Sequence, residues 1–169
     1  MEEKHLYVVA QFDAQTNQTL AALYQALVAE GLLGTQAKDI PYHITLGTFE
    51  IEDEVEVIRR AHAAARTMDA FTLRLSHIGL FGLDVLFIAP AVKQQLLDLL
   101  HAVVPGGGTA DEFPWVAHTT LLMDEPQNIQ RAIPVVAKHF APFRACVESI
   151  GVYEFSPERK IGVYELGKC

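Results

Sequence analysis

Hydrophobic and polar positions repeat with two different periods along the chain. Short apolar runs rich in β-branched and aromatic residues predict strands, whereas apolar residues recurring every three or four positions predict helices. The first half of the chain carries both patterns. It gives strands at 5–12, 43–49 and 71–82, and helices at 17–33 and 52–67. Gly31 and Gly34 are expected to end the first helix.

The same order of patterns then starts again. The second half predicts strands at 84–90, 118–123 and 143–155, and helices at 91–104 and 126–140. Pro134 is expected to bend the last helix or split it in two. A final strand at 160–167 follows a predicted hairpin turn at 156–159, and the glycine-rich segment 105–114 reads as a flexible connection.

Each half is therefore expected to be a β-α-β-α-β unit. The segments SHIGLF (76–81) and ESIGVY (148–153) are similar and occupy corresponding places in the two units. We interpret the chain as one bilobal domain over 1–169, made of pseudo-twofold repeats at approximately 1–82 and 83–169. Two units are too few for a solenoid, which needs at least three.

A short motif, His-x-Thr-Leu, opens the middle strand of both units. The first copy is HITL (43–46) and the second is HTTL (118–121). Because side chains alternate along a strand, His43, Thr45 and Gly47 should share one face, and so should His118, Thr120 and Leu122. If the units meet across a pseudo-twofold axis, both His and both Thr converge on one cleft.

Two imidazoles and two hydroxyls suit chemistry at phosphorus. At neutral pH one imidazole can accept a proton from an attacking water or hydroxyl while the other donates a proton to the leaving oxygen. The two hydroxyls can donate hydrogen bonds to the non-bridging phosphate oxygens. This scheme needs no metal, and we expect no cofactor, because the sequence lacks H-E-x-x-H or a similar zinc pattern.

Composition and charge limit the location and the ligand. Half of the residues are hydrophobic and a fifth are charged, which is typical of a globular protein. No apolar run approaches the roughly 20 residues that span a bilayer, so we expect a cytoplasmic protein without a membrane partner. The net charge of −8 would repel a long duplex nucleic acid. We therefore expect a small nucleotide or a short RNA end as the ligand.

The repeated motif resembles the signature of the 2H phosphoesterase superfamily, which is named for two H-x-[ST]-hydrophobic motifs. That family includes 2′-5′ RNA ligase-like proteins and cyclic nucleotide phosphodiesterases. The resemblance implies an α+β fold with antiparallel sheets around a central cleft and helices outside. It also implies metal-independent hydrolysis of a 2′,3′-cyclic phosphate, with the same site used for 2′-5′ RNA ligation or 2′-5′ phosphodiester cleavage as an alternative. A non-catalytic protein that binds a nucleotide or an RNA end is a third interpretation.

The resemblance also implies roles for single residues. His43 and His118 become the acid and base, and Thr45 and Thr120 hold the phosphate. The sequence does not decide which His is the base, although His118 is preferred for activating water. Four aromatic residues are candidates for contacts with the substrate, and core packing is the alternative for each of them: Tyr42, Phe81, Trp115 and Tyr153. Lys160 and Arg159 could touch a phosphate, or simply lie in a solvated turn.

Overall fold

The computed structural model describes residues 4–105, 114–155 and 159–168, and its elements follow the predicted order. The first unit contains β1 (His5–Phe12), α1 (Ala14–Ala29), β2 (His43–Glu50), a 3-10 turn (Ile51–Asp53), α2 (Glu54–Thr67) and β3 (Phe71–Phe81). The second contains β4 (Val85–Ala91), α3 (Gln94–Val103), β5 (Thr119–Met123), α4 (Pro126–His139) and β6 (Phe143–Phe155), with β7 (Arg159–Glu165) after it. The repeated β-α-β-α-β order is confirmed.

The helix boundaries differ in detail from the prediction, and α3 begins at Gln94, three residues later than expected. Helix α1 begins three residues early because the Asp13 carboxylate caps it, accepting a hydrogen bond of 2.9 Å from the Thr16 N–H. It ends at Ala29, just before Gly31, whose φ of 76° favours glycine. Pro134 lies within α4 but does not split it. The predicted turn at 156–159 and connection at 105–114 fall largely outside the described residues.

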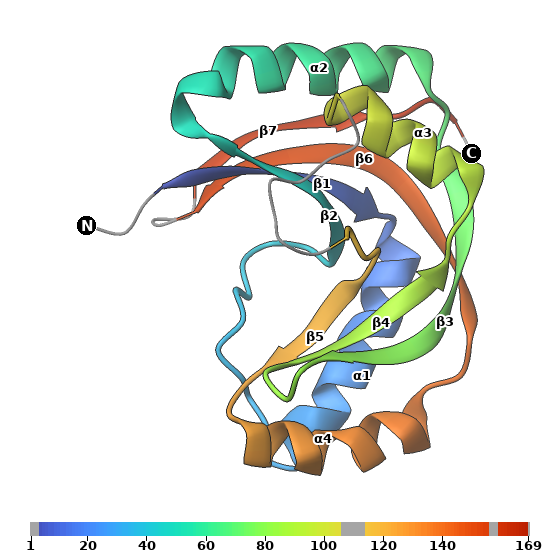
Figure 1. Ribbon diagram of the computed structural model, residues 1–169. Helices are drawn as coiled ribbons and strands as arrows, with labels where there is room; N and C mark the ends of the chain where they lie inside the picture. Colours follow the sequence, from blue (N-terminus) through green and yellow to red (C-terminus); the bar gives the residue numbers. More distant parts are fainter. Residues whose placement is uncertain (1–3, 106–113, 156–158, 169) are drawn as a thin grey trace.

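The strands form one antiparallel sheet rather than two separate ones. Its order is β2-β1-β6-β3-β4-β5, and β7 also pairs with β6. Strand β6 joins the two lobes, since Phe143–Val147 pairs with β3 whereas Ser149–Glu154 pairs with β7. Figure 1 shows the result: α2 and α3 lie beside β1, β2, β6 and β7, while α1 and α4 lie beside β3, β4 and β5.

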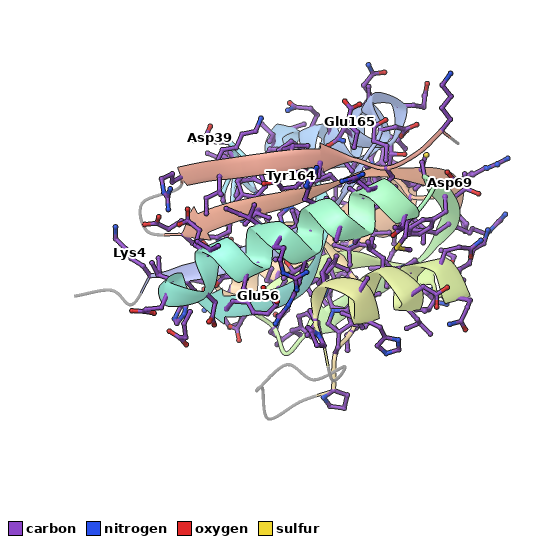
Figure 2. The ribbon with its side chains drawn as sticks, turned by 90° about the horizontal axis from the view of Figure 1, so that it is seen from above. Lys4, Asp39, Glu56, Asp69, Tyr164 and Glu165 are labelled. Atoms are coloured by element: carbon purple, nitrogen blue, oxygen red, sulfur yellow. The ribbon has the colours of Figure 1, made fainter. Side chains whose placement is uncertain are left out.

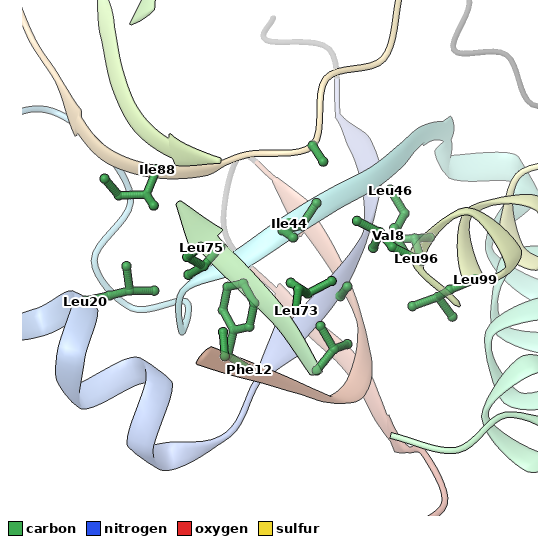
Figure 3. Packing of buried hydrophobic residues seen from close by; sticks show 14 of the residues in the cluster. Val8, Phe12, Leu20, Ile44, Leu46, Leu73, Leu75, Ile88, Leu96 and Leu99 are labelled. Carbon is green, nitrogen blue, oxygen red and sulfur yellow. The ribbon is translucent and has the colours of Figure 1, made fainter. Parts of the chain in front are cut away.

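A single hydrophobic core continues from one lobe to the other. One face of the sheet contributes alternate strand residues, such as Val8 and Phe12 on β1 and Leu73 and Leu75 on β3. Ile44 of β2 lies near the middle of this core (Figure 3). The helices cover this face, and the opposite face of the sheet carries His43 and Thr45.

A β-bulge interrupts β2 inside the motif. Val8 pairs with Gly47 and Val9 pairs with Thr45, so Leu46 is an extra residue. Leu46 and Gly47 are consequently both buried, and a Cβ at Gly47 would lie only 2.7 Å from the Val104 side chain in the core. The prediction that Gly47 shares the face of His43 is therefore wrong, because the bulge reverses the alternation.

The second copy of the motif contains a matching bulge. Leu86 pairs with Leu122 and Phe87 pairs with Thr120, so Leu121 is the extra residue. Both Leu121 and Leu122 are buried. The expectation that Leu122 shares the face of His118 is wrong for the same reason, and the leucine of His-x-Thr-Leu is the bulged residue in both units.

The residue between His118 and Thr120 faces the core. Thr119 is 1% exposed, and its hydroxyl has no hydrogen-bond partner within the described part of the chain. The corresponding residue of the first copy, Ile44, is apolar and fully buried. A buried hydroxyl without a partner carries a desolvation penalty of about 1–3 kcal/mol.

We therefore predict that Thr119→Val raises the free energy of unfolding by about 1 kcal/mol, because it replaces the hydroxyl by a methyl group of similar shape. Urea unfolding followed by circular dichroism measures the change. The matched control is Thr16→Val, since the buried Thr16 hydroxyl accepts a hydrogen bond of 3.2 Å from the Cys146 N–H. The control should lose stability, and a loss in both variants would contradict the prediction.

Candidate active site

The two His-x-Thr motifs lie on the two ends of the sheet path. His43 is the first residue of β2 and His118 immediately precedes β5, and these strands are the terminal members of the order β2-β1-β6-β3-β4-β5. The sheet curves enough that residue pairs of β2 and β5 have Cα atoms within 8 Å. The imidazoles are close enough for His118 to lower the pKa of His43. The structure thus brings the motifs together.

Both imidazoles are held in the same orientation. Nδ1 of His43 lies 2.8 Å from the Pro41 carbonyl oxygen, and Nδ1 of His118 lies 2.8 Å from the Val116 carbonyl oxygen. A carbonyl only accepts, so each Nδ1 carries a hydrogen and donates it. Nε2 is consequently the proton-exchanging atom of both rings.

Burial favours the neutral form of both imidazoles. Desolvation lowers the pKa of His43 below its ordinary value of 6.5, partly offset by the Pro41 hydrogen bond, and His118 lowers it further. Desolvation also lowers the pKa of His118, against the opposing effect of Val116. Thr45 and Thr120, two positions after the imidazoles, are half-buried, and neither hydroxyl makes a hydrogen bond within the described part of the chain.

An aromatic wall surrounds His118. The Phe81 ring meets the imidazole edge-on with centroids 4.7 Å apart, and the Phe87 ring lies 5.1 Å from it. The two phenyl rings are 4.5 Å apart. Phe87 extends over Gly79, where a Cβ would overlap its ring. Phe81 is still 38% exposed and so presents ring surface beside the candidate site.

Beside His43, polar side chains joined by hydrogen bonds take the place that the aromatic rings have beside His118. Gln11 is the residue opposite His43 in the β1–β2 register. Its amide Nε2 donates to the Tyr153 hydroxyl over 2.6 Å, and the Ser149 hydroxyl donates to its Oε1 over 3.2 Å. Tyr153 is only 5% exposed, so it belongs to a buried hydrogen-bonded group rather than to an open stacking surface.

The other two aromatic candidates have structural contacts. The Trp115 indole N–H donates to the Thr45 carbonyl oxygen over 2.9 Å and so connects the segment before β5 to β2. The Tyr42 backbone N–H donates to the Asn17 side chain on α1 over 2.9 Å. Burial, with a contribution from Tyr24 of α1, raises the pKa of Tyr42 to about 12. Tyr42 therefore lies toward α1.

A second connection mirrors that of Trp115. The Thr35 N–H donates to the Met123 carbonyl oxygen over 2.7 Å, and the Met123 N–H donates to the Gln36 side chain over 3.1 Å. The loop before β2 thus caps β5, while the segment before β5 caps β2. Each motif strand has its free edge partly satisfied by the other unit.

Sequence reasoning missed Phe87, Gln11 and Ser149. Phe87 and Gln11 lie next to the motifs across the sheet, since Phe87 pairs with Thr120 and Gln11 with His43. Ser149 lies one strand further, where it pairs with Gln11. The repeat could have indicated these residues, because the first strand of each unit pairs with the strand that carries the motif: β1 with β2, and β4 with β5. The bulges, which fix the register, gave no sequence signal.

The described residues contain no group of three or more His, Cys, Asp or Glu side chains arranged to hold a metal ion. The candidate site brings together two imidazoles, two hydroxyls and two different walls.

No helix within the described ranges is both long and apolar enough to cross a membrane.

We predict that Trp115→Phe lowers the free energy of unfolding by about 1 kcal/mol, because it removes the indole donor to Thr45 and keeps an aromatic ring. Chemical denaturation followed by circular dichroism measures this change. Imidazole resonances of both His43 and His118 should also shift in NMR spectra, since the two strands lose a common contact. A variant with wild-type stability and unchanged imidazole resonances would show that this contact does not hold the strands together.

Several solved structures share the fold of this chain. E. coli LigT in its apo form is 17% identical, with a TM-score of 0.64 over 99% of both chains. LigT complexed with 3′-AMP is 18% identical, with a TM-score of 0.66 over 98% of this chain and 99% of that one. TT0787 of Thermus thermophilus is 16% identical, with a TM-score of 0.64 over 96% of this chain and 97% of that one. These likenesses show the fold.

No curated protein matches the sequence. A sequence profile of the 2′-5′ RNA ligase superfamily, however, matches residues 13–158, which include both motifs and most of both repeats. With this match over most of its length, the chain belongs to the 2′-5′ RNA ligase (2H phosphoesterase) superfamily.

Proposed function

We propose that the protein is a metal-independent phosphoesterase that hydrolyses the 2′,3′-cyclic phosphate of a nucleotide or a short RNA end. The observation that carries the proposal is the pair of imidazoles from equivalent strands, each with Nδ1 donating to a carbonyl two residues upstream. Two exchangeable Nε2 atoms then belong to one site, as in-line displacement at phosphorus requires.

The proposed reaction uses the two imidazoles in complementary states. One neutral Nε2 accepts a proton from water as the water oxygen forms its bond to phosphorus. The bond from phosphorus to one ribose oxygen breaks, and the other imidazole, protonated on Nε2, gives that oxygen its proton. The Thr45 and Thr120 hydroxyls donate to the non-bridging oxygens, where charge increases in the transition state.

Two further observations support a small or short substrate. LigT, which has the same fold, forms complexes with 3′-AMP, ATP and NADP+. The net charge of −8 would repel a long polyanion. The name of the matching superfamily favours 2′-5′ RNA ligation as a second candidate, because joining of RNA ends would use the same acid and base in reverse.

Replacing His43 or His118 by Ala should reduce turnover of a 2′,3′-cyclic nucleotide by at least about a hundredfold, because general acid–base catalysis contributes about 10²–10⁴. Product formation measured by chromatography tests this. RNA fragments with a 2′,3′-cyclic phosphate or a 5′-hydroxyl end, incubated together, distinguish hydrolysis from joining.

The matched control is His101→Ala, which removes an exposed imidazole on α3 and should leave turnover unchanged. All assays contain EDTA, since the proposed scheme uses no metal. Wild-type turnover in both motif variants would contradict the assignment, and so would activity that EDTA abolishes and zinc restores.

The pH dependence follows from the direction of the pKa shifts. In the free protein, kcat/KM falls at low pH when the base becomes protonated and at high pH when the acid loses its proton. Both imidazoles have pKa values below 6.5. We therefore predict a bell-shaped profile of kcat/KM centred below pH 6.5. A maximum above pH 7.5 would contradict this description of the site.

A further inference from the structure

An open cavity of about 770 Å³ lies beside the His43 half of the site. Its walls include the polar side chains of Gln11, Ser149 and Tyr153, all of which are buried. Sites for small molecules typically have volumes of about 300–1,000 Å³ and a few convergent polar groups. The cavity has the size and the lining of a ligand site, and neither motif histidine contributes to its walls.

The strand register connects this cavity to His43. His43 pairs with Gln11, Gln11 with Ser149, and Ser149 with Glu165, so the four side chains form one row across β2, β1, β6 and β7. Glu165 lies three strand spacings from His43, roughly 14 Å at about 4.8 Å per strand. A nucleotide whose phosphate lies at His43 would direct its base along this row.

The face of the sheet is consistent with this row. Figure 2 shows Tyr164 of β7 beside α2, where its ring lies 5.7 Å from that of His62. Glu165 is the next residue and therefore points to the opposite face, which is the face of His43. Pro41 also lines the cavity, and its carbonyl oxygen holds the His43 ring.

The buried network has a hydrogen-bond donor left over. The Tyr153 hydroxyl accepts a hydrogen bond from Gln11, so its own hydrogen remains available, and none of the described residues accepts it. Gln11 and Tyr153 are each only 5% exposed. Tyr153 lines the open cavity, so an acceptor on a ligand bound there would receive this hydrogen.

The charges around the cavity favour a donor-rich ligand. Its lining includes the carboxylates of Asp39, Glu148 and Glu165, and one cation, Lys160. Burial and the neighbouring carboxylates of Asp13 and Glu165 raise the pKa of Glu148. Such a lining disfavours a second phosphate and favours a group with several N–H donors and a nearby acceptor.

The His118 half of the site lacks these properties. Thr120 pairs with the aromatic Phe87, whereas the equivalent Thr45 of the His43 half pairs with Val9. The repeat also makes Phe81, which has no hydroxyl, the counterpart of Tyr153. One half therefore offers hydrogen bonds, whereas the other offers aromatic rings. Selection by hydrogen bonding must come from the His43 half.

We propose that the cavity binds the guanine base of a nucleotide whose phosphate lies between His43 and His118. Guanine presents adjacent donors, N1–H and the 2-amino group, which match a carboxylate, and its O6 acceptor suits Lys160 or the Tyr153 hydroxyl. Glu165, at the end of the row from His43, is the carboxylate assigned to these donors. The inference rests on the proposed function for the position of the phosphate.

Calorimetric titration with guanosine 3′-monophosphate and inosine 3′-monophosphate tests the proposal, because the two differ only in the 2-amino group. The wild-type protein should bind the guanosine nucleotide at least about tenfold more tightly, since a hydrogen bond to a charged group is lost with inosine. Glu165→Gln should reduce this preference to about twofold or less. Glu52→Gln, which changes an exposed carboxylate of the 3-10 turn, should retain it.

Tyr153→Phe provides a second variant, and inorganic phosphate provides a control for folding. Both variants should bind phosphate as the wild type does, and Tyr153→Phe should weaken nucleotide binding. Equal affinity of the wild-type protein for both nucleotides, or a preference that survives Glu165→Gln, would overturn the proposal. Because binding needs no turnover, a guanine preference without hydrolysis would contradict only the proposed function, and hydrolysis without the preference would contradict only this inference.

Discussion

The structure depends on how it holds two edge strands together. The edges of a sheet carry unpaired backbone groups, and β2 and β5 are the strands that carry the motifs. Each edge is capped by the segment that precedes the other strand. Trp115 donates to Thr45 on β2, while Thr35 and Gln36 hydrogen-bond Met123 on β5. This exchange of caps ties the two terminal strands of the sheet to each other's units and brings the two halves of the site together.

Within each strand, a bulge and a carbonyl fix the side chains. The bulge at Leu46 or Leu121 allows the motif residues to face the cleft while the residues after them return to the core. The carbonyl of Pro41 or Val116 then fixes the imidazole through Nδ1. Because these features are the same in both units, the backbone does not distinguish acid from base. The distinction must come from the unlike walls and from the substrate.

Much of the fold followed from the sequence because the two hydrophobic periods are clear and each unit repeats the other. The order of elements and the pairing of the motifs were predicted in this way, whereas the helices outside the sheet were implied by the family resemblance. The bulges were not, because a bulge changes register without changing composition: Gly47 and Leu122 continue the alternating pattern but point into the core.

The roles of the aromatic residues were also beyond the sequence. Phe81 does lie beside His118. Trp115 instead donates to the Thr45 carbonyl, Tyr42 lies toward α1, and Tyr153 accepts a hydrogen bond from the buried Gln11 amide. Composition cannot separate an aromatic ring that faces a cleft from one that closes it, since the difference depends on strand register and on partners distant in sequence. Gln11 and Phe87 were missed for the same reason.

A crystal structure of the protein with bound orthovanadate, which mimics phosphorus in the course of displacement, tests the central claim most directly. We expect one vanadate in the cleft, with Nε2 of His43 and Nε2 of His118 within hydrogen-bonding distance on opposite sides. The Thr45 and Thr120 hydroxyls should contact its other oxygens. A vanadate bound elsewhere, or contacts with only one of the two imidazoles, would contradict the claim that the repeated motifs form a single catalytic site.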